Sequence, residues 1–258
     1  MNVKPLLIAA IGACVGVAAL EAYNRYGGNM TEMSRPELHQ VIRDYIVNNP
    51  EVLQEAMAEF EKRQNLADAE KARDAIKRNE NLIFNSPRHV VAGNKEGDVS
   101  LVEFFDYNCP YCKQAMADIN ALENSDKKLR IVYKEFPVLG PGSVEAAQVA
   151  VAIRMQDPSG EKYLAYRKAL LSGRGQADKA RALAVARDVG VDMDRLETDL
   201  ANPEIKATLE ENFKLAEQLG LNGTPSYVIG QEVAVGALGL NTLKEKVRIA
   251  RCNATATC

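Results

Sequence analysis

The chain has 258 residues, of which 47% are hydrophobic and 26% are charged, a composition typical of a globular protein. This length allows one sizeable domain and an accessory element. The net charge of −3 gives no electrostatic reason to expect a nucleic-acid partner, and the absence of tryptophan with only 6% aromatic residues argues against a base-stacking surface.

The first 28 residues are typical of an export signal. Lys4 precedes an apolar run from Leu6 to Leu20, and a polar stretch follows at residues 21–25. The apolar run is short for a full membrane span, which takes ~20 residues, and no clean small-x-small cleavage site follows it. We therefore predict export, with residues 1–28 acting either as a cleaved signal peptide or as an uncleaved membrane anchor.

A long helical segment is predicted after the linker Gly27-Gly28-Asn29. One helix opens at Ser34-Arg35-Pro36-Glu37, and a second restarts at Asn49-Pro50-Glu51 and continues to about residue 79. Apolar residues form a stripe along these helices: Val41, Ile42, Tyr45, Ile46, Leu53, Met57 and Phe60. Because so long a stripe needs a partner, we predict that residues 29–84 form an oligomerisation stalk rather than fold back on their own domain.

The cysteine pair Cys109-Pro110-Tyr111-Cys112 joins a predicted strand over 99–105 to a predicted helix that begins at Pro110. At such a junction unpaired backbone N–H groups and the positive end of the helix dipole face the Cys109 sulfur and stabilise its thiolate. Cys112 lies one turn further on, within reach to close or resolve a disulfide. A zinc site would need further ligands, which the chain's two histidines do not supply in a suitable pair. The pair is therefore predicted to be a redox dithiol with Cys109 as the reactive thiol, and no metal or cofactor is expected.

The following elements complete an α/β domain that we expect over 85–258. Its predicted strands, besides 99–105, are a short strand at 89–93, a strand at 129–136 and a hairpin at 227–235. From 142 to 220 the pattern is almost wholly helical, and a last helix covers 240–251. Cys252 and Cys258 either form a local bridge at the C-terminus or stay free, and neither is expected to be catalytic.

Three ordered segments resemble the DsbA-like branch of the thioredoxin superfamily: the run from Glu103 to Cys112, the strand from Val132 to Pro137, and Gly223-Thr224-Pro225-Ser226-Tyr227-Val228. The resemblance implies an α/β, thioredoxin-like fold with a helical insertion at about 142–220. It also implies that the bond between Thr224 and Pro225 is cis and packs against the dithiol. The N-terminal segment resembles the stalk of the suppressor-of-copper-sensitivity protein C (ScsC) group, in which the stalk makes a trimer. We therefore expect a trimer here or, failing that, a dimer.

Glu103 interrupts the apolar strand before the dithiol, and two interpretations stay open. A solvated position would give Glu103 no role. In the resembling family an acid at this position lies beneath the active-site helix and takes part in its proton transfers. A buried carboxylate is costly unless it is paired, so Lys134 on the neighbouring predicted strand is the expected charge partner. The residues expected to support Cys109 and Cys112 are therefore Pro110, Tyr111, Thr224, Pro225, Glu103 and Lys134.

The resemblance implies a periplasmic thiol–disulfide oxidoreductase that acts on protein disulfides. The threonine before the expected cis-proline and the oligomerising stalk resemble isomerase-type members, so a disulfide isomerase or reductase is favoured. A DsbA-like dithiol oxidase and a copper-binding or copper-protective thiol protein are the alternatives, because two thiolates can hold Cu(I). The expected partners are protein substrates with cysteines, a membrane redox partner and further copies of this chain. Nucleic acid is not among them.

Overall fold

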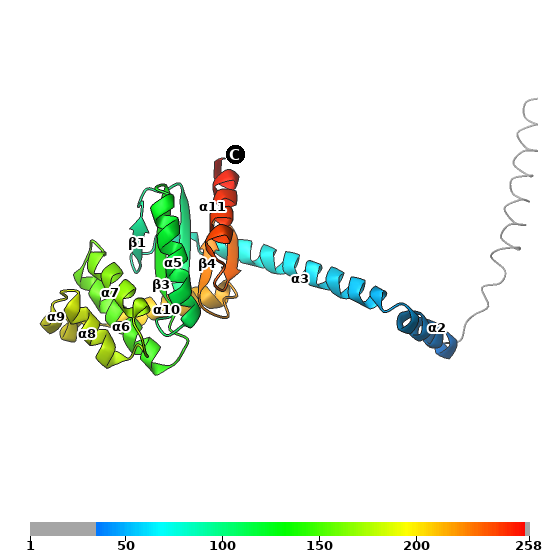
Figure 1. The fold of residues 1–258 in the computed structure, drawn as a ribbon, viewed down its shortest axis with the longest axis horizontal. Coiled ribbons are helices and arrows are strands. Elements are labelled where there is room, and N and C mark those ends of the chain that lie inside the picture. The colour runs from blue at the N-terminus through cyan, green and yellow to red at the C-terminus, as the bar shows by residue number, and fades with distance from the viewer. Residues whose placement is uncertain (1–34, 256–258) are drawn as a thin grey trace, which may run out of the picture. The chain divides into compact units, whose positions relative to one another are not determined.

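The structure, a computed structural model, describes residues 35–255 (Figure 1). The chain divides into two compact units after Gln64. Residues 1–28, which we predicted to be a signal peptide or membrane anchor, lie outside the described residues. Within residues 35–255 no helix combines the length and the apolarity that crossing a membrane requires.

Two successive helices form the described part of the first unit. Helix α2 spans Arg35–Asn48, and α3 spans Glu51–Arg78 and continues past Gln64 into the second unit. The break between them falls at Pro50, because proline disfavours a helical conformation of the residue before it. The side chain of Asn49 donates a hydrogen bond to the carbonyl of Tyr45, 2.8 Å away, at the end of α2. Both predicted helices are confirmed.

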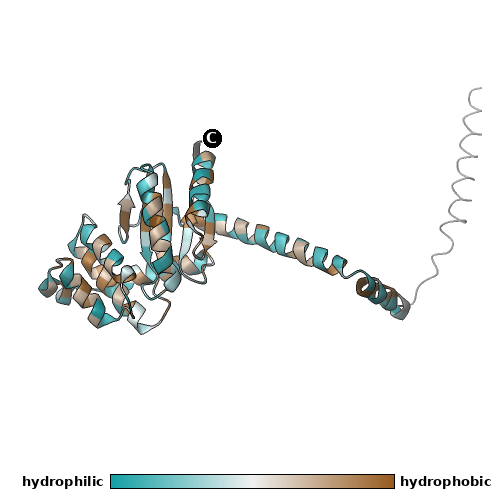
Figure 2. Cartoon of the chain, in the orientation of Figure 1, coloured by the Kyte–Doolittle hydropathy of each residue, from teal (hydrophilic) through white to brown (hydrophobic). Residues whose placement is uncertain are grey.

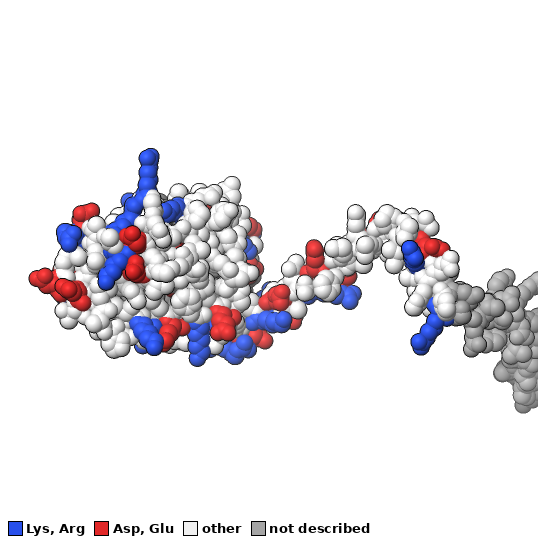
Figure 3. All heavy atoms as spheres, turned by 90° about the horizontal axis from the view of Figure 1, so that it is seen from below, with Lys and Arg blue, Asp and Glu red and all other residues white. Residues whose placement is uncertain are grey.

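The apolar stripe predicted along these helices is exposed to solvent in the single chain. Figure 2 shows apolar residues alternating with polar residues along α2 and α3. The exposed large apolar side chains of the two helices are Leu38, Val41, Ile42, Tyr45, Ile46, Val47, Leu53, Met57, Phe60 and Leu66. On the face shown in Figure 3 acidic and basic side chains are interspersed, and ion pairs such as Arg63–Glu59 connect successive turns of α3.

The second unit is built on a five-stranded sheet with the strand order β1-β3-β2-β4-β5. The strands are β1 (Val90–Gly93), β2 (Val99–Phe105), β3 (Leu129–Glu135), β4 (Ser226–Ile229) and β5 (Glu232–Val235). Strands β2 and β3 are parallel and are joined by helix α5 (Pro110–Ser125), whereas β4 is antiparallel to β2 and forms a hairpin with β5. The predicted strands and hairpin are confirmed, and they make the sheet of a thioredoxin-like α/β fold.

A helical insertion separates β3 from β4, as the sequence predicted. Its helices are α6 (Pro141–Gln156), α7 (Glu161–Ser172), α8 (Lys179–Asp188), α9 (Met193–Asp199) and α10 (Pro203–Gln218). Polar N-caps define three of the helix starts, because the side chains of Asp178, Asp192 and Asn202 each accept a backbone N–H of the first turn.

Helix α11 (Leu240–Thr255) follows the hairpin and packs on α5 and β2. Its Leu243 and Val247 are buried in the domain core. Cys252 on this helix is disulfide-bonded, whereas Cys258 lies outside the described residues.

Apolar side chains pack on both faces of the sheet. One core lies between the sheet and helices α5, α7 and α11, and it continues among the helices of the insertion. The other core contains Ala75 and Ile76 of α3 and Ile83 of the short helix α4 (Glu80–Phe84), packed with residues of α10 and β2. The last turns of the segment 29–84, which we predicted to be a stalk, thus contribute to the domain core, because Ala75, Ile76 and Ile83 pack with apolar residues of the sheet.

Candidate active site

The dithiol lies where strand β2 leads into helix α5. Cys109 is the N-cap of α5, and Pro110 is its first residue, where a missing N–H costs nothing. Both Cys109 and Cys112 are free thiols and buried, whereas Pro110 and Tyr111 between them are exposed. The predicted position of the pair at a helix N-terminus is confirmed.

The two thiols differ in acidity. A hydrogen bond from the Cys112 thiol lowers the pKa of Cys109 to about 6, and further bonds from the Thr224 side chain and from the backbone N–H groups of Cys112 and Tyr111 outweigh the opposing effect of burial. Burial raises the pKa of Cys112 far above its ordinary value, and its bond to Cys109 and the nearby charge of Glu103 raise it further. At neutral pH Cys109 is therefore the thiolate, and Cys112 is a protonated neighbour.

The loop before β4 lies against the reactive sulfur. The peptide bond between Thr224 and Pro225 is cis, as the resemblance implied. In its protonated form the Cys109 thiol donates a hydrogen bond to the carbonyl of Thr224, 3.1 Å from Sγ. The structure therefore brings Thr224 and Pro225 to the dithiol from 115 residues away along the chain.

Asp106 fixes the turn between β2 and the dithiol, although the sequence analysis did not select it. Its buried carboxylate accepts hydrogen bonds from the backbone N–H of Asn108 (2.7 Å), from the Ser143 hydroxyl (2.7 Å) and from the N–H groups of Val138 (2.8 Å) and Leu139 (3.0 Å). It thus holds the active-site turn and the loop after β3 together. The signal in the sequence was an acid directly after a buried strand.

Asn108 connects the same turn to the helical insertion. Its side chain accepts a hydrogen bond from the backbone N–H of Ala177 at 2.7 Å and donates one to the carbonyl of Ala177 at 2.9 Å. Its amide nitrogen also lies 2.9 Å from the Ser143 hydroxyl. The residue before Cys109 is therefore fixed by the insertion as well as by Asp106.

Glu103 is fully buried on β2, so the interpretation as a solvated strand residue is wrong. Its Oε2 accepts a hydrogen bond from Nη2 of Arg167 on α7 at 2.5 Å. The Arg167 guanidinium also lies over the rings of Tyr133 and Phe105, 3.8 and 4.5 Å from their centroids. Burial raises the pKa of Glu103, and the charge of Arg167 partly offsets that effect.

The predicted pairing of Glu103 with Lys134 is wrong. In the parallel pairing of β2 and β3, Glu103 lies beside Tyr133, and Lys134 lies beside Phe104. Side chains alternate between the faces of a sheet, so Lys134 points away from Glu103 and from the dithiol. Lys134 is buried on the other face, where its Nζ donates to the carbonyl of Leu82 at 2.7 Å.

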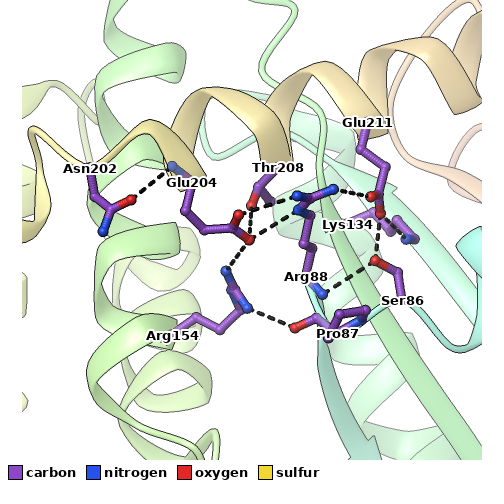
Figure 4. Close-up of polar contacts among 9 residues, drawn as sticks. All are labelled: Ser86, Pro87, Arg88, Lys134, Arg154, Asn202, Glu204, Thr208 and Glu211. Carbon is purple, nitrogen blue, oxygen red and sulfur yellow. Dashed lines mark hydrogen bonds and ion pairs between the residues drawn. The ribbon is translucent and has the colours of Figure 1, made fainter.

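The polar contacts around Lys134 link segments of the fold to one another and do not include the dithiol (Figure 4). Glu211 of α10 lies 3.9 Å from its Nζ, and the same carboxylate receives hydrogen bonds from Ser86 and Arg88. Arg88 also pairs with Glu204 at 3.0 Å. This network ties the segment after α4 to α10 and to the sheet, and burial lowers the pKa of Lys134 to about 8.

Arg167, which pairs with Glu103, is a second residue of the site that the sequence analysis missed. It lies in the run Tyr163–Leu171, whose other buried members are apolar or aromatic. A single arginine on the buried face of a predicted helix was the available signal, because a buried guanidinium requires a partner.

Comparison with known proteins agrees with this geometry. The family described as the DSBA-like thioredoxin domain matches residues 100–248, more than half of the chain. The chain belongs to the DsbA-like thioredoxin family. The family described as the copper resistance protein ScsC N-terminal domain matches residues 35–66, which form α2 and the first half of α3. This DsbA-like protein therefore carries an ScsC-type N-terminal segment, and its family is that of thiol–disulfide oxidoreductases.

Solved structures of similar proteins cover most of the chain. A thioredoxin-like oxidoreductase from Silicibacter pomeroyi is 43% identical, with a TM-score of 0.63 over 66% of this chain and 96% of its own. The thiol-disulfide exchange protein alpha-DsbA2 from Wolbachia pipientis is 30% identical, with a TM-score of 0.65 over 71% of this chain and 97% of its own. A linker-deletion mutant of ScsC from Proteus mirabilis is 25% identical, with a TM-score of 0.66 over 87% of this chain and 98% of its own.

Curated relatives of the chain include larger proteins. The Na(+)/H(+) antiporter NhaA 1 of Salinispora arenicola is 27% identical over 162 residues, which are 62% of this chain and 24% of the antiporter. The chain thus spans about a quarter of the length of this relative.

Proposed function

We propose that this DsbA-like protein rearranges or reduces disulfides in exported proteins, as a periplasmic disulfide isomerase or reductase. The observation that carries the proposal is the asymmetry of the dithiol. Cys109, with a pKa of about 6, lies at a helix N-terminus against the Thr224 loop, and the protonated Cys112 lies behind it. A thiolate that is ionised at neutral pH and backed by a second thiol suits attack on a disulfide.

The chemistry proceeds by thiol–disulfide exchange. The Cys109 thiolate attacks one sulfur of a substrate disulfide and forms a mixed disulfide, and the other substrate sulfur leaves as a thiolate. In isomerisation a substrate thiolate then attacks the mixed disulfide and releases Cys109 unchanged. In reduction Cys112 attacks the Cys109 sulfur, so that the dithiol is oxidised to a disulfide and the substrate gains two electrons. A membrane redox partner would return the Cys109–Cys112 disulfide to the dithiol.

The exposed apolar side chains of the N-terminal unit support the proposal that the protein is an oligomer. The side chains of its apolar stripe, including Val41, Tyr45, Met57 and Phe60, are exposed in the single chain. Burying each such side chain contributes ~1.5–3 kcal/mol, so a few of them per copy offset the entropy lost on association. We propose that residues 29–64 associate into a trimer or, failing that, a dimer. Several dithiols would then surround one misfolded substrate.

One experiment tests the function and the oligomer together. The mature full-length protein and a variant that begins at Asn65, the first residue of the second compact unit, are compared on a protein with scrambled disulfides and on a dithiol peptide. The full-length protein should restore the native disulfides and should scatter light as an oligomer. The truncated variant should be a monomer that oxidises the peptide but loses isomerase activity, and Cys109→Ser should be inactive in both assays.

A dithiol oxidase is the second candidate, because a stabilised Cys109 thiolate also makes the corresponding disulfide a better oxidant. The redox state of the dithiol in cells separates the two functions. A mostly reduced pair supports the isomerase or reductase, whereas a mostly oxidised pair, or a full-length monomer at micromolar concentration, supports the oxidase. Tight Cu(I) binding by the reduced protein without any disulfide turnover would instead assign a copper-protective role.

A further inference from the structure

The helical insertion places a buried cation against Glu103 of β2. Arg167 of α7 is 3% exposed, and its Nη2 donates to Oε2 of Glu103. Its guanidinium also lies over the aromatic rings of Phe105 on β2 and Tyr133 on β3. A buried charge that loses its partner is strongly unfavourable, so this pair holds both groups in one arrangement.

The two oxygens of Glu103 have different surroundings. Oε2 is bound by Arg167, whereas Oε1 is buried and accepts no hydrogen bond from any residue in the described part of the chain. Cys112 is buried in the first turn of α5, in the same core as Phe105 and Tyr133, and the negative charge of Glu103 raises the pKa of its thiol. Oε1 is therefore the oxygen of Glu103 that no donor among the described residues occupies and that is left to accept a proton.

Titratable groups face the ion pair from each strand and helix around it. The groups that interact electrostatically with Glu103 or Arg167 are Tyr107, Cys109, Cys112, Tyr133, Glu135, Tyr163 and Tyr227. Each of these groups is neutral when protonated and negative when ionised. Arg167 is the cation that offsets their negative charge. The charge state of Glu103 therefore depends on an arginine that the thioredoxin sheet itself does not supply.

We propose that Arg167 is a positioning residue for the resolving step of disulfide exchange, because its charge favours the ionised form of Glu103 and its Nη2 binds Oε2, which leaves Oε1 to receive the proton of Cys112. The inference rests on the proposed function and names the residue that controls its second step. In that step the Cys112 proton moves to Oε1, and the Cys112 sulfur attacks the Cys109 sulfur. The bond between Cys109 and the substrate breaks, and its electron pair leaves on the substrate sulfur as a thiolate.

The proposal predicts a shift in the pH dependence of resolution. An opposite charge within hydrogen-bonding distance lowers the pKa of a carboxyl by about 1–3 units, so replacing Arg167 by an uncharged residue should raise the pKa of Glu103 by that amount. The resolving step needs the ionised carboxylate, and its rate rises with pH as Glu103 loses its proton. In Arg167→Met this rise should therefore move to higher pH by about 1–3 units.

Stopped-flow kinetics with an aromatic disulfide that releases a coloured thiol separate the two steps on the full-length protein. The first phase reports attack by Cys109, and the second phase reports resolution by Cys112. Arg167→Met should shift the pH profile of the second phase alone, whereas Arg167→Lys, which keeps the charge, should restore a profile closer to wild type. Lys168→Met removes the neighbouring, exposed cation of α7 and should leave both phases unchanged.

The outcomes distinguish the inference from the function on which it rests. If the first phase is absent from the wild type and from every variant, the proposed function fails. If the first phase is normal and the second-phase profile of Arg167→Met coincides with wild type, Arg167 is only structural and the inference fails. If Arg167→Met does not fold, Glu103→Gln provides the test. A second-phase pH profile of Glu103→Gln that coincides with wild type would also overturn the inference.

Discussion

Replacing Cys112 should make Cys109 markedly less acidic. The hydrogen bond from the Cys112 thiol is the largest of the effects that hold the pKa of Cys109 at about 6. Cys112→Ala removes this donor, whereas Cys112→Ser keeps a hydroxyl donor at the same place. The two variants therefore differ in the one interaction of interest, and both lack the resolving thiol.

The expected change follows from the strength of a hydrogen bond to a charged group. Such a bond contributes about 1.5–3 kcal/mol, and 1.36 kcal/mol corresponds to one pKa unit, so the loss is about 1–2 units. The pKa of Cys109 in Cys112→Ala should then lie at about 7–8, still below the ~8.5 of a free cysteine, because the Thr224 and backbone donors remain. Cys112→Ser should stay within about one unit of wild type.

The rate of alkylation of Cys109 by iodoacetamide, measured against pH, gives the pKa directly. The ultraviolet absorbance of the thiolate provides an independent measurement on the same samples. A midpoint near 6 in both variants would refute the reasoning, since it would show that the helix N-terminus and Thr224 stabilise the thiolate without Cys112. Labelling of Cys112 before Cys109 in the wild type at mildly acidic pH would contradict the assignment of the reactive thiol itself.

Three further predictions concern stability and the correction at Lys134. Asp106→Ala should lower the free energy of unfolding of the reduced protein by about 3–5 kcal/mol, because a buried acceptor of four hydrogen bonds is lost; a loss below about 1 kcal/mol in urea unfolding would contradict this role. Lys134→Met should destabilise the protein but leave the pH midpoint of Cys109 alkylation near 6. A change of one pH unit in this midpoint would show that Lys134 acts on the active site after all. The depressed pKa of Cys109 contributes stability that is complete above its unfolded value of ~8.5 and is lost as pH falls through about 6. The difference in Tm between the reduced wild type and Cys109→Ser should therefore be greater at about pH 9 than at about pH 5, and a difference independent of pH would contradict the low pKa.

The reactive centre could be predicted because its determinants are local. An apolar strand, a cysteine at an N-cap and a proline at the first helical position are adjacent in the chain, and each depends on backbone geometry over a few residues. The hairpin at the end of the sheet and the helices of the insertion are likewise indicated by periodicity and by capping residues. The approach of Thr224 to Cys109 is a long-range contact, and it was predicted only through the resemblance to a family.

Sequence by itself thus determined the elements of this protein and the chemistry of Cys109 and Cys112. Tertiary structure decided the charge partner of Glu103 and the role of the last turns of α3. Successive side chains of a strand point to opposite faces of the sheet, so a shift of one residue in strand pairing changes which side chains meet. The observed register of β2 and β3 sets Tyr133, and not Lys134, beside Glu103. The cation that pairs with Glu103 is Arg167, which lies 64 residues further along the chain. No local pattern specifies such a meeting, because it depends on how a separate helix packs against the sheet.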